Sequence, residues 1–260
     1  MPLDYSTYLR VDRLLDLQVP QSAPAEHDEM LFIVIHQTYE LWFKQILHEV
    51  GKINRNFDEG DVFGAIHTFK RLRTIMKTLV GQIDILETMT PVSFTSFRDR
   101  LDTASGFQSV QFRQAEFALG YKRPEMLKYQ QQDARAVATL RQTLAEPSLV
   151  DHFYTFLERH GVPLPAELRG RGPEEPNVAS PALQQSILRL YREEPPMTIL
   201  FELMTDFDEG LQEWRYRHCK LVERAIGNRQ GTGGSLGVEF LKRSLFQPVF
   251  PDLWAIRASL

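Results

Sequence analysis

Two long stretches without proline constrain this chain more than any other feature of its sequence. No proline lies between Glu26 and Thr90 or between Met197 and Gln247. Several prolines instead crowd one short segment, namely Pro163, Pro165, Pro173, Pro176 and Pro181. Proline is disfavoured inside helices because it lacks an N–H donor and its ring clashes with the preceding turn. The distribution therefore predicts two long helical regions with a loop between them.

The apolar residues in both stretches recur at the spacing of a helix face. Over residues 30–50 they stand three or four positions apart, and a second stripe over residues 203–226 ends at Gly227, a residue type that often closes helices. Further helices are predicted over residues 63–86, 91–101 and 107–119, and apolar periodicity resumes over residues 183–191. Clean strand alternation is absent from the sequence. The predicted fold class is all-α, with long core helices.

Length and composition are typical of one soluble globular unit. The 260 residues are 43% hydrophobic and 25% charged, which is enough apolar material for a sizeable core. We expect a single domain over residues 1–260, with an N-terminal arm over residues 1–20. The loop-rich segment over about residues 161–181 is interpreted as an insertion within that domain.

Charge and cysteine content disfavour several classes of function. The net charge of −4 is spread without long blocks of one sign, so no nucleic acid or membrane partner is expected. The N-terminus lacks the continuous apolar core of a signal peptide, and no apolar run approaches the roughly 20 residues of a membrane span, so a cytoplasmic location is expected. The single cysteine, Cys219, excludes an intramolecular disulfide and Cys-rich metal sites.

Two of the seven histidines fall on the apolar stripes. His36 follows Phe32 by four residues and His218 follows Trp214 by four, so each is expected to face the interior. Both could be core histidines satisfied by a neighbouring carbonyl or hydroxyl. Two such residues on separate helices also suit a bundle that encloses haem, in which one neutral imidazole ligates the iron. Cys219 would point about 100° away from His218 on a helix, so His218 is the better candidate ligand.

Three other features allow either a structural or a functional interpretation. Arg98 stands beside an aromatic stripe, where its planar fork could capture a carboxylate or extend into solvent. The glycine-rich residues 231–235 follow a helix and lack a P-loop ending, so they form either a surface connector or a loop that closes over a ligand with the Thr232 hydroxyl. Tyr5 and Tyr8 can share one side of a helical turn, although tyrosines near a terminus are usually packing anchors.

Five ordered blocks of sequence closely resemble those of the tryptophan 2,3-dioxygenase family. They are Glu26-His27-Asp28-Glu29-Met30-Leu31-Phe32-Ile33-Val34-Ile35-His36-Gln37-Thr38 continuing to Glu40-Leu41-Trp42, Phe97-Arg98-Asp99, Ser105-Gly106-Phe107-Gln108-Ser109, Trp214-Arg215-Tyr216-Arg217-His218 and Gly231-Thr232-Gly233-Gly234-Ser235. The resemblance covers the chain from residue 5 to about residue 250. Five blocks in the family's order are far more specific than any single motif.

The resemblance implies a helical homotetramer with one haem b per subunit, ferrous in its active state. His218 would be the proximal iron ligand, Ser105 would lie near the haem edge, and His36 would be the distal histidine that hydrogen-bonds the indole N–H. Arg98 would pair with the substrate carboxylate. Other expected substrate-binding residues are Thr232 and Gly231 in the glycine-rich loop, Phe32 and Leu101 around the indole, and Tyr5 and Tyr8, which would reach a neighbouring subunit's pocket.

The implied activity is insertion of both atoms of O₂ across the indole C2–C3 bond of L-tryptophan, which gives N-formylkynurenine and begins tryptophan catabolism by the kynurenine pathway. An apolar pocket with a few convergent polar groups suits such a substrate. We interpret His36 as a positioning group, because the indole N–H is too weak an acid to need prior removal. Phe94 departs from the family pattern, since many members carry tyrosine there.

Two alternatives remain open at this point. A relative on the same haem scaffold could instead perform a monooxygenation of an aromatic amino acid or a substituted indole, because fold does not fix reaction. The number of oxygen atoms incorporated would separate these two activities. A non-catalytic helical interaction protein, with two merely structural histidines, would give a colourless preparation.

Overall fold

The computed structural model describes residues 3–169, 172, 175, 177–227, 229 and 237–260. Within these ranges every regular element is a helix, either α or 3₁₀, and no strand occurs. The predicted all-α fold class is therefore confirmed. Among the same residues, no helix combines the length and the apolar character needed to cross a bilayer.

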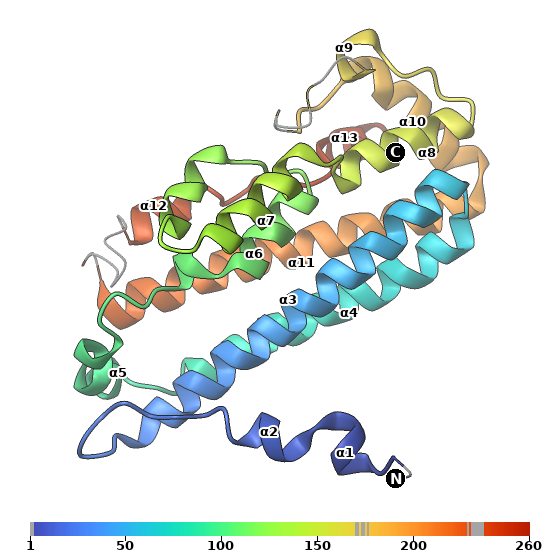
Figure 1. The fold of residues 1–260 in the computed structure, drawn as a ribbon. Coiled ribbons are helices and arrows are strands. Elements are labelled where there is room, and N and C mark those ends of the chain that lie inside the picture. Colours follow the sequence, from blue (N-terminus) through green and yellow to red (C-terminus); the bar gives the residue numbers. More distant parts are fainter. Residues whose placement is uncertain (1–2, 170–171, 173–174, 176, 228, 230–236) are drawn as a thin grey trace.

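Three long helices form the centre of the molecule (Figure 1). They are α3 (His27–Glu59), α4 (Val62–Leu86) and α11 (Pro195–Ile226), and α4 packs against both of the others. The two long helical regions predicted from the proline pattern are both present, and each helix starts before its apolar stripe. Helix α11 ends where predicted, at Gly227, whose φ of 60° is accessible to glycine without a Cβ penalty.

A tight connection reverses the chain between α3 and α4. Gly60 closes α3 in the left-handed conformation, with φ 75°, and its N–H bonds to the carbonyl of Phe57. Asp61 then caps α4, because its Oδ1 accepts the N–H of Gly64 at 2.9 Å. The short connection forces the two helices to run antiparallel and side by side, as Figure 1 shows.

Shorter helices lie beside this centre and at its ends (Figure 1). They are α5 (Pro91–Arg98), α6 (Val110–Ala118), α7 (Ala134–Ala145), α8 (Leu149–Arg159), α9 (Ala166–Arg169), α10 (Pro181–Glu193), α12 (Val238–Lys242) and α13 (Pro251–Ala255). The sequence patterns do not predict α7 and α8. Helix α5 is shorter than expected, since Leu101 falls in a 3₁₀ turn over Asp99–Leu101, and the predicted helix over residues 107–119 is divided into a 3₁₀ turn (Gly106–Gln108) and α6.

Two apolar clusters make up the core. The larger joins the three long helices to α8, α10 and α13, and its centre holds fully buried side chains such as Phe57, Phe69 and Phe201. The smaller one contains Phe117, Met126, Leu140 and Leu144, with Phe107 and Phe240 packed against it. Side chains of both clusters line one cavity, which therefore lies where they meet.

The N-terminal arm stands apart from both clusters. Its two short helices, α1 (Tyr5–Leu9) and α2 (Val11–Leu15), contain no buried residue, and their apolar side chains are exposed. The link to the body runs through Gln37 of α3, whose Nε2 donates to the carbonyl of Leu17 at 3.0 Å. The arm thus follows the start of α3 without packing into the core (Figure 1).

Candidate active site

A cavity of about 320 Å³ lies among α3, α4, α5, α6, α11 and α12. Most of its wall is apolar and largely aromatic: Phe32, Tyr39, Phe43, Ile83, Leu86, Met89, Phe94, Phe107, Phe112, Trp214, Leu221, Val222, Ala225, Ile226, Phe240 and Leu241. The polar side chains in the wall are few: His36, Glu40, Arg98, Ser105, Ser109, Arg113, Glu116, Arg123, Arg215, His218 and Ser244. An apolar cavity with a small number of polar groups is the usual form of a small-molecule site.

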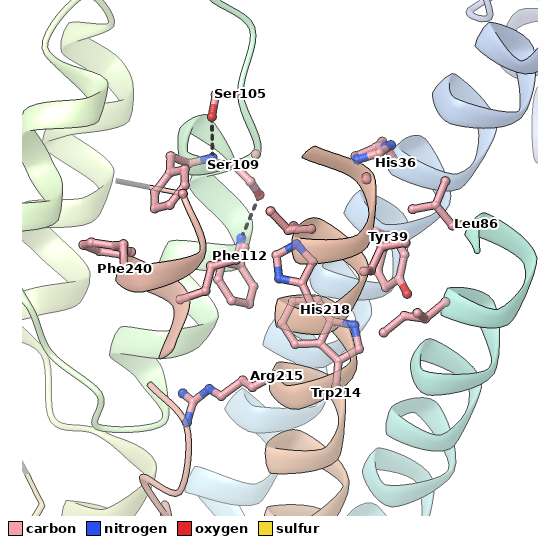
Figure 2. A pocket seen from close by; sticks show the side chains of 18 of the residues that line it. His36, Tyr39, Leu86, Ser105, Ser109, Phe112, Trp214, Arg215, His218 and Phe240 are labelled. Carbon is pink, nitrogen blue, oxygen red and sulfur yellow. Dashed lines mark hydrogen bonds between the residues drawn. The ribbon is translucent and has the colours of Figure 1, made fainter. Parts of the chain in front are cut away.

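His218 projects from α11 toward this cavity (Figure 2). Its imidazole stacks on the indole of Trp214 one turn earlier, with ring centroids 5.1 Å apart and an interplanar angle of 19°. Burial lowers the pKa of His218 to about 4, and nearby His36 adds to that effect, so the ring is neutral at physiological pH. None of the described residues forms a hydrogen bond with a ring nitrogen of His218. The neutral ring therefore has a lone pair available to a ligand in the cavity.

His36 faces the same cavity from α3. Its Nδ1 lies 2.7 Å from the carbonyl oxygen of Phe32. A carbonyl oxygen only accepts, so the neutral ring carries its proton on Nδ1 and presents Nε2 as an acceptor. The surrounding protein lowers the pKa of His36 by desolvation, which outweighs the Phe32 carbonyl and Glu40. The position of His36 on the apolar stripe predicts a ring that is packed in the core. The ring instead keeps accessible surface, because it borders the cavity.

Aromatic contacts fix the wall between the two histidine helices. Trp214 lies 6.1 Å from Tyr39 and 5.3 Å from Phe112, measured between ring centroids, so α11 contacts both α3 and α6 at this level. Tyr39 donates its hydroxyl to the carbonyl of Leu79 on α4 at 2.7 Å. Burial raises the pKa of Tyr39 to about 12, so the phenol remains a donor. Helices α3, α4 and α6 thus hold the wall behind His218 of α11.

A second aromatic group surrounds the end of the cavity near α5. The Phe32 ring lies 4.0 Å from that of His36, 5.8 Å from Phe94 and 5.6 Å from Phe97. Arg98 follows Phe97 at the end of α5 and also lines the cavity. Aromatic faces, a guanidinium and the Nε2 acceptor of His36 therefore border one cavity, which suits a flat ring that carries a carboxylate.

Charged side chains from α6, the following loop and α11 line another part of the cavity. Glu116 accepts from Arg113 and, at 2.9 Å, from Nη2 of Arg123, while an oxygen of Glu116 lies 3.7 Å from Nη2 of Arg215. Arg215 also donates from Nη1 to the carbonyl of Gln247 at 3.0 Å. Side-chain exposure is 4% for Arg113, Glu116 and Arg215 and 15% for Arg123. This cluster links α6 and α11 to the segment that precedes α13.

The structure brings together half of the ten residues that the sequence predicts for the site. Phe32, His36, Arg98, Ser105 and His218 all line the cavity. Leu101 lies in the 3₁₀ turn after α5 and is not part of the wall. Tyr5 and Tyr8 are 78% and 71% exposed on the arm, away from this chain's own cavity. Gly231 and Thr232 lie outside the described residues.

Several residues of the cavity wall are missed by sequence reasoning. Phe112 and Phe240 contribute aromatic rings to the wall, and Arg113, Glu116 and Arg123 bring charge into it. A signal for the last group is present in the sequence, because Arg113 and Glu116 stand three apart between Phe112 and Phe117. Charges at that spacing in an apolar stretch favour a buried pair over a solvated face.

Comparisons of the sequence with known proteins find relatives over nearly the whole chain. A family model described as tryptophan 2,3-dioxygenase matches residues 2–164 and 174–260. Among curated relatives, the tryptophan 2,3-dioxygenase of Herpetosiphon aurantiacus is 51% identical over 261 residues, which cover 99% of this chain and 98% of that protein. The proteins of the same name from Anaeromyxobacter dehalogenans and Caulobacter vibrioides are 47% and 42% identical to this chain. Each match covers 99% of this chain, and the matches cover 96% and 98% of the two relatives, respectively.

Proposed function

The chain belongs to the tryptophan 2,3-dioxygenase family, and from this premise we propose that its cavity binds haem b and L-tryptophan side by side. It is a dioxygenase that oxidises tryptophan. The proposed reaction inserts both atoms of O₂ across the indole C2–C3 bond. The product is then N-formylkynurenine, the first intermediate of tryptophan catabolism by the kynurenine pathway.

The cavity residues fit a haem. A porphyrin brings four nitrogen ligands of its own and needs one neutral imidazole from the protein, which His218 supplies because burial keeps its pKa near 4. Aromatic and aliphatic side chains of the wall suit a flat apolar macrocycle, and Ser105 borders the same space. When bound, the haem supplies ferrous iron and with it the redox chemistry with O₂.

The chain's own residues then select and orient the amino acid. The Nε2 acceptor of His36 is suited to the indole N–H, and the rings of Phe32 and Phe94 to the indole faces. Arg98 is proposed to pair with the substrate carboxylate, and Gly231 and Thr232 to hold the ammonium and carboxylate. The apolar wall excludes water from the reacting ring. His36 acts as a positioning group, because the indole N–H is a very weak acid and C3 can be attacked with that proton in place.

Assembly is proposed to complete the pocket. Tyr5 and Tyr8 are exposed on an arm with no buried residue, which is consistent with their entry into a neighbouring subunit's pocket in a cytoplasmic homotetramer. Leu101, in the turn after α5, is proposed to contact the indole when substrate is bound. Both assignments depend on the family membership of the chain and not on a contact within one subunit.

The observation that carries this proposal is that two imidazoles, from helices far apart in the sequence, face one apolar cavity. The test gives reduced, haem-loaded protein L-tryptophan under isotopically labelled O₂ and measures the product by mass spectrometry. Two labelled atoms in a ring-opened product are expected. One labelled atom would instead indicate a monooxygenase on the same scaffold, and a protein that takes up no haem would refute the proposal altogether.

A further inference from the structure

The buried charged cluster in the cavity wall carries more positive than negative charge. It holds three guanidinium groups, from Arg113, Arg123 and Arg215, and one carboxylate, from Glu116, which leaves 3 − 1 = +2. Among the described residues, Glu116 is the one carboxylate within ion-pair distance of these three arginines. Buried charge without a counter-ion is strongly unfavourable, because the lost hydration is not replaced. Arg215 also attracts the buried carboxylate of Asp208 and donates to the carbonyls of Ser244 and Gln247, so the positive charge that is least compensated by the described residues lies at Arg113 and Arg123.

The hydrogen bonds within the cluster leave donors unused. Nε of Arg123 and Nε of Arg215 are buried and have no hydrogen-bond partner among the described residues. Stacking on aromatic rings compensates in part, since the Arg123 and Arg215 guanidiniums lie 4.4 and 4.8 Å from the centroid of the Tyr121 ring. Desolvation nevertheless lowers the pKa of Arg113, and repulsion from the Arg123 guanidinium lowers it further. The attraction of Glu116 acts in the opposite direction and is outweighed. The guanidiniums are thus only partly stabilised by the protein itself.

The cluster lies within reach of the haem position proposed above. Arg215 precedes His218 by one turn of α11, and Phe112, next to Arg113, contacts the Trp214 ring that stacks on His218. In Figure 2, His36 and Arg215 lie at opposite ends of the view with His218 between them. All four charged residues line the same cavity as both histidines. A ligand held at His218 would therefore share its cavity with the cluster and with His36.

We propose that Arg113, Arg123 and Arg215 form the anion site that receives the carboxylates of the haem, with Glu116 as the internal partner that offsets part of their charge. This inference rests on the haem-binding function proposed above. Haem b carries two carboxylates, which would offset the positive charge that Glu116 leaves in the cluster. Arginine suits the role because its planar fork binds carboxylates through paired hydrogen bonds. Arg98, at the end of α5, then serves the carboxylate of the amino acid.

The test compares haem with its dimethyl ester, which keeps the iron and the ring but lacks both charges. Apo-protein is titrated with each, and axial ligation and affinity are followed through the Soret band. The wild-type protein is expected to bind haem about ten- to a hundredfold more tightly than the ester. Arg113→Gln and Arg123→Gln are expected to reduce this ratio by about tenfold each while ester affinity stays unchanged. Arg135→Gln, at an exposed site on α7, is the matched control and should leave the ratio as it is.

Glu116→Gln provides a test in the opposite direction. It raises the net charge of the cluster from +2 to +3, so the preference for haem over the ester should increase, and haem should raise the melting temperature of this variant more than that of the wild type. General damage to the fold would instead weaken both ligands together in every variant.

The outcomes separate this inference from the function on which it rests. Absence of any Soret band would refute haem binding itself. Equal affinity of haem and ester in a protein that binds both would refute the anion site and leave haem binding intact. Stabilisation of the apo-protein by inorganic phosphate, without a difference between haem and ester, would assign the cluster to a free anion and also overturn the proposal.

Discussion

The Nδ1 of His36 lies 2.7 Å from the backbone carbonyl oxygen of Phe32, one turn earlier on the same helix. This hydrogen bond determines the tautomer of the neutral ring, because the carbonyl accepts the proton of Nδ1 and Nε2 is left with a lone pair. The side chain that faces the cavity from α3 is therefore an acceptor. The first prediction follows from that chemistry.

Replacement of His36 by alanine should weaken substrate binding more than it impairs the reaction. Loss of one hydrogen bond to the indole N–H, worth about 1 kcal/mol, should raise KM for L-tryptophan several-fold to tenfold and leave measurable turnover. His36→Gln keeps an acceptor at this position and should recover part of the affinity. Steady-state kinetics together with substrate titrations would measure both. Abolished turnover with unchanged affinity for tryptophan would show that His36 is an obligatory base.

Arg98 should distinguish amino acids from amines. If its guanidinium pairs with the substrate carboxylate, Arg98→Gln should weaken L-tryptophan binding by about ten- to a hundredfold, the usual loss for a charge-assisted pair. Binding of tryptamine, which lacks the carboxylate, should not change. Arg100→Gln, an exposed neighbour two residues further along, is the control. An equal loss for both ligands would contradict a carboxylate-specific role.

The stability of the apo-protein should fall on mild acidification because of His218. Its folded pKa is about 4, below the ordinary value of 6.5, so between these values the unfolded chain takes up a proton that the folded protein does not. The contribution to stability is complete above pH 6.5 and declines as the pH falls toward 4. The loss amounts to at most about 3 kcal/mol. Urea titrations at several pH values should show a shallower decline for His218→Leu than for the wild type or the exposed-site control His27→Gln.

Asp208 should be essential for the attachment of the C-terminal segment. Its fully buried carboxylate accepts the N–H groups of Val249 and Phe250, at 2.9 and 3.1 Å, and the indole N–H of Trp254 at 3.0 Å. Asp208→Asn would turn an amide donor toward these donors, so a loss of about 2–4 kcal/mol in the free energy of unfolding is expected. Glu209→Gln, exposed on the same helix, should cost little. Comparable stability of the two variants would contradict this anchoring role.

Local patterns predict the long helices well because their causes are local. The absence of proline and the three- and four-residue apolar spacing are sufficient to identify α3, α4 and α11, and both candidate histidines lie on those stripes. The end of α5 is less predictable. Leu101 follows Phe97 by four residues, as a continuing helix would require, yet the chain tightens into a 3₁₀ turn and leaves it at Asp102 with φ 47°.

Tertiary contacts explain what the patterns miss. Arg113 and Glu116 share α6, whereas Arg123 belongs to the following loop and Arg215 to α11, and only the packing of these three segments brings the four side chains together. Taken by itself, each of these charged side chains is of a type that usually lies on the solvated surface. The cavity cannot be predicted from the sequence patterns either, because its wall contains side chains from both apolar clusters.

The order of the helices along the chain also has a consequence during synthesis. Helix α3 leaves the ribosome before α11, which carries Trp214 and His218, and before the segment that Asp208 anchors. Neither wall of the cavity is complete until they dock. A nascent chain therefore exposes the apolar inner faces of α3 and α4 until α11 has been synthesised, and ligand capture has to follow the docking of α11.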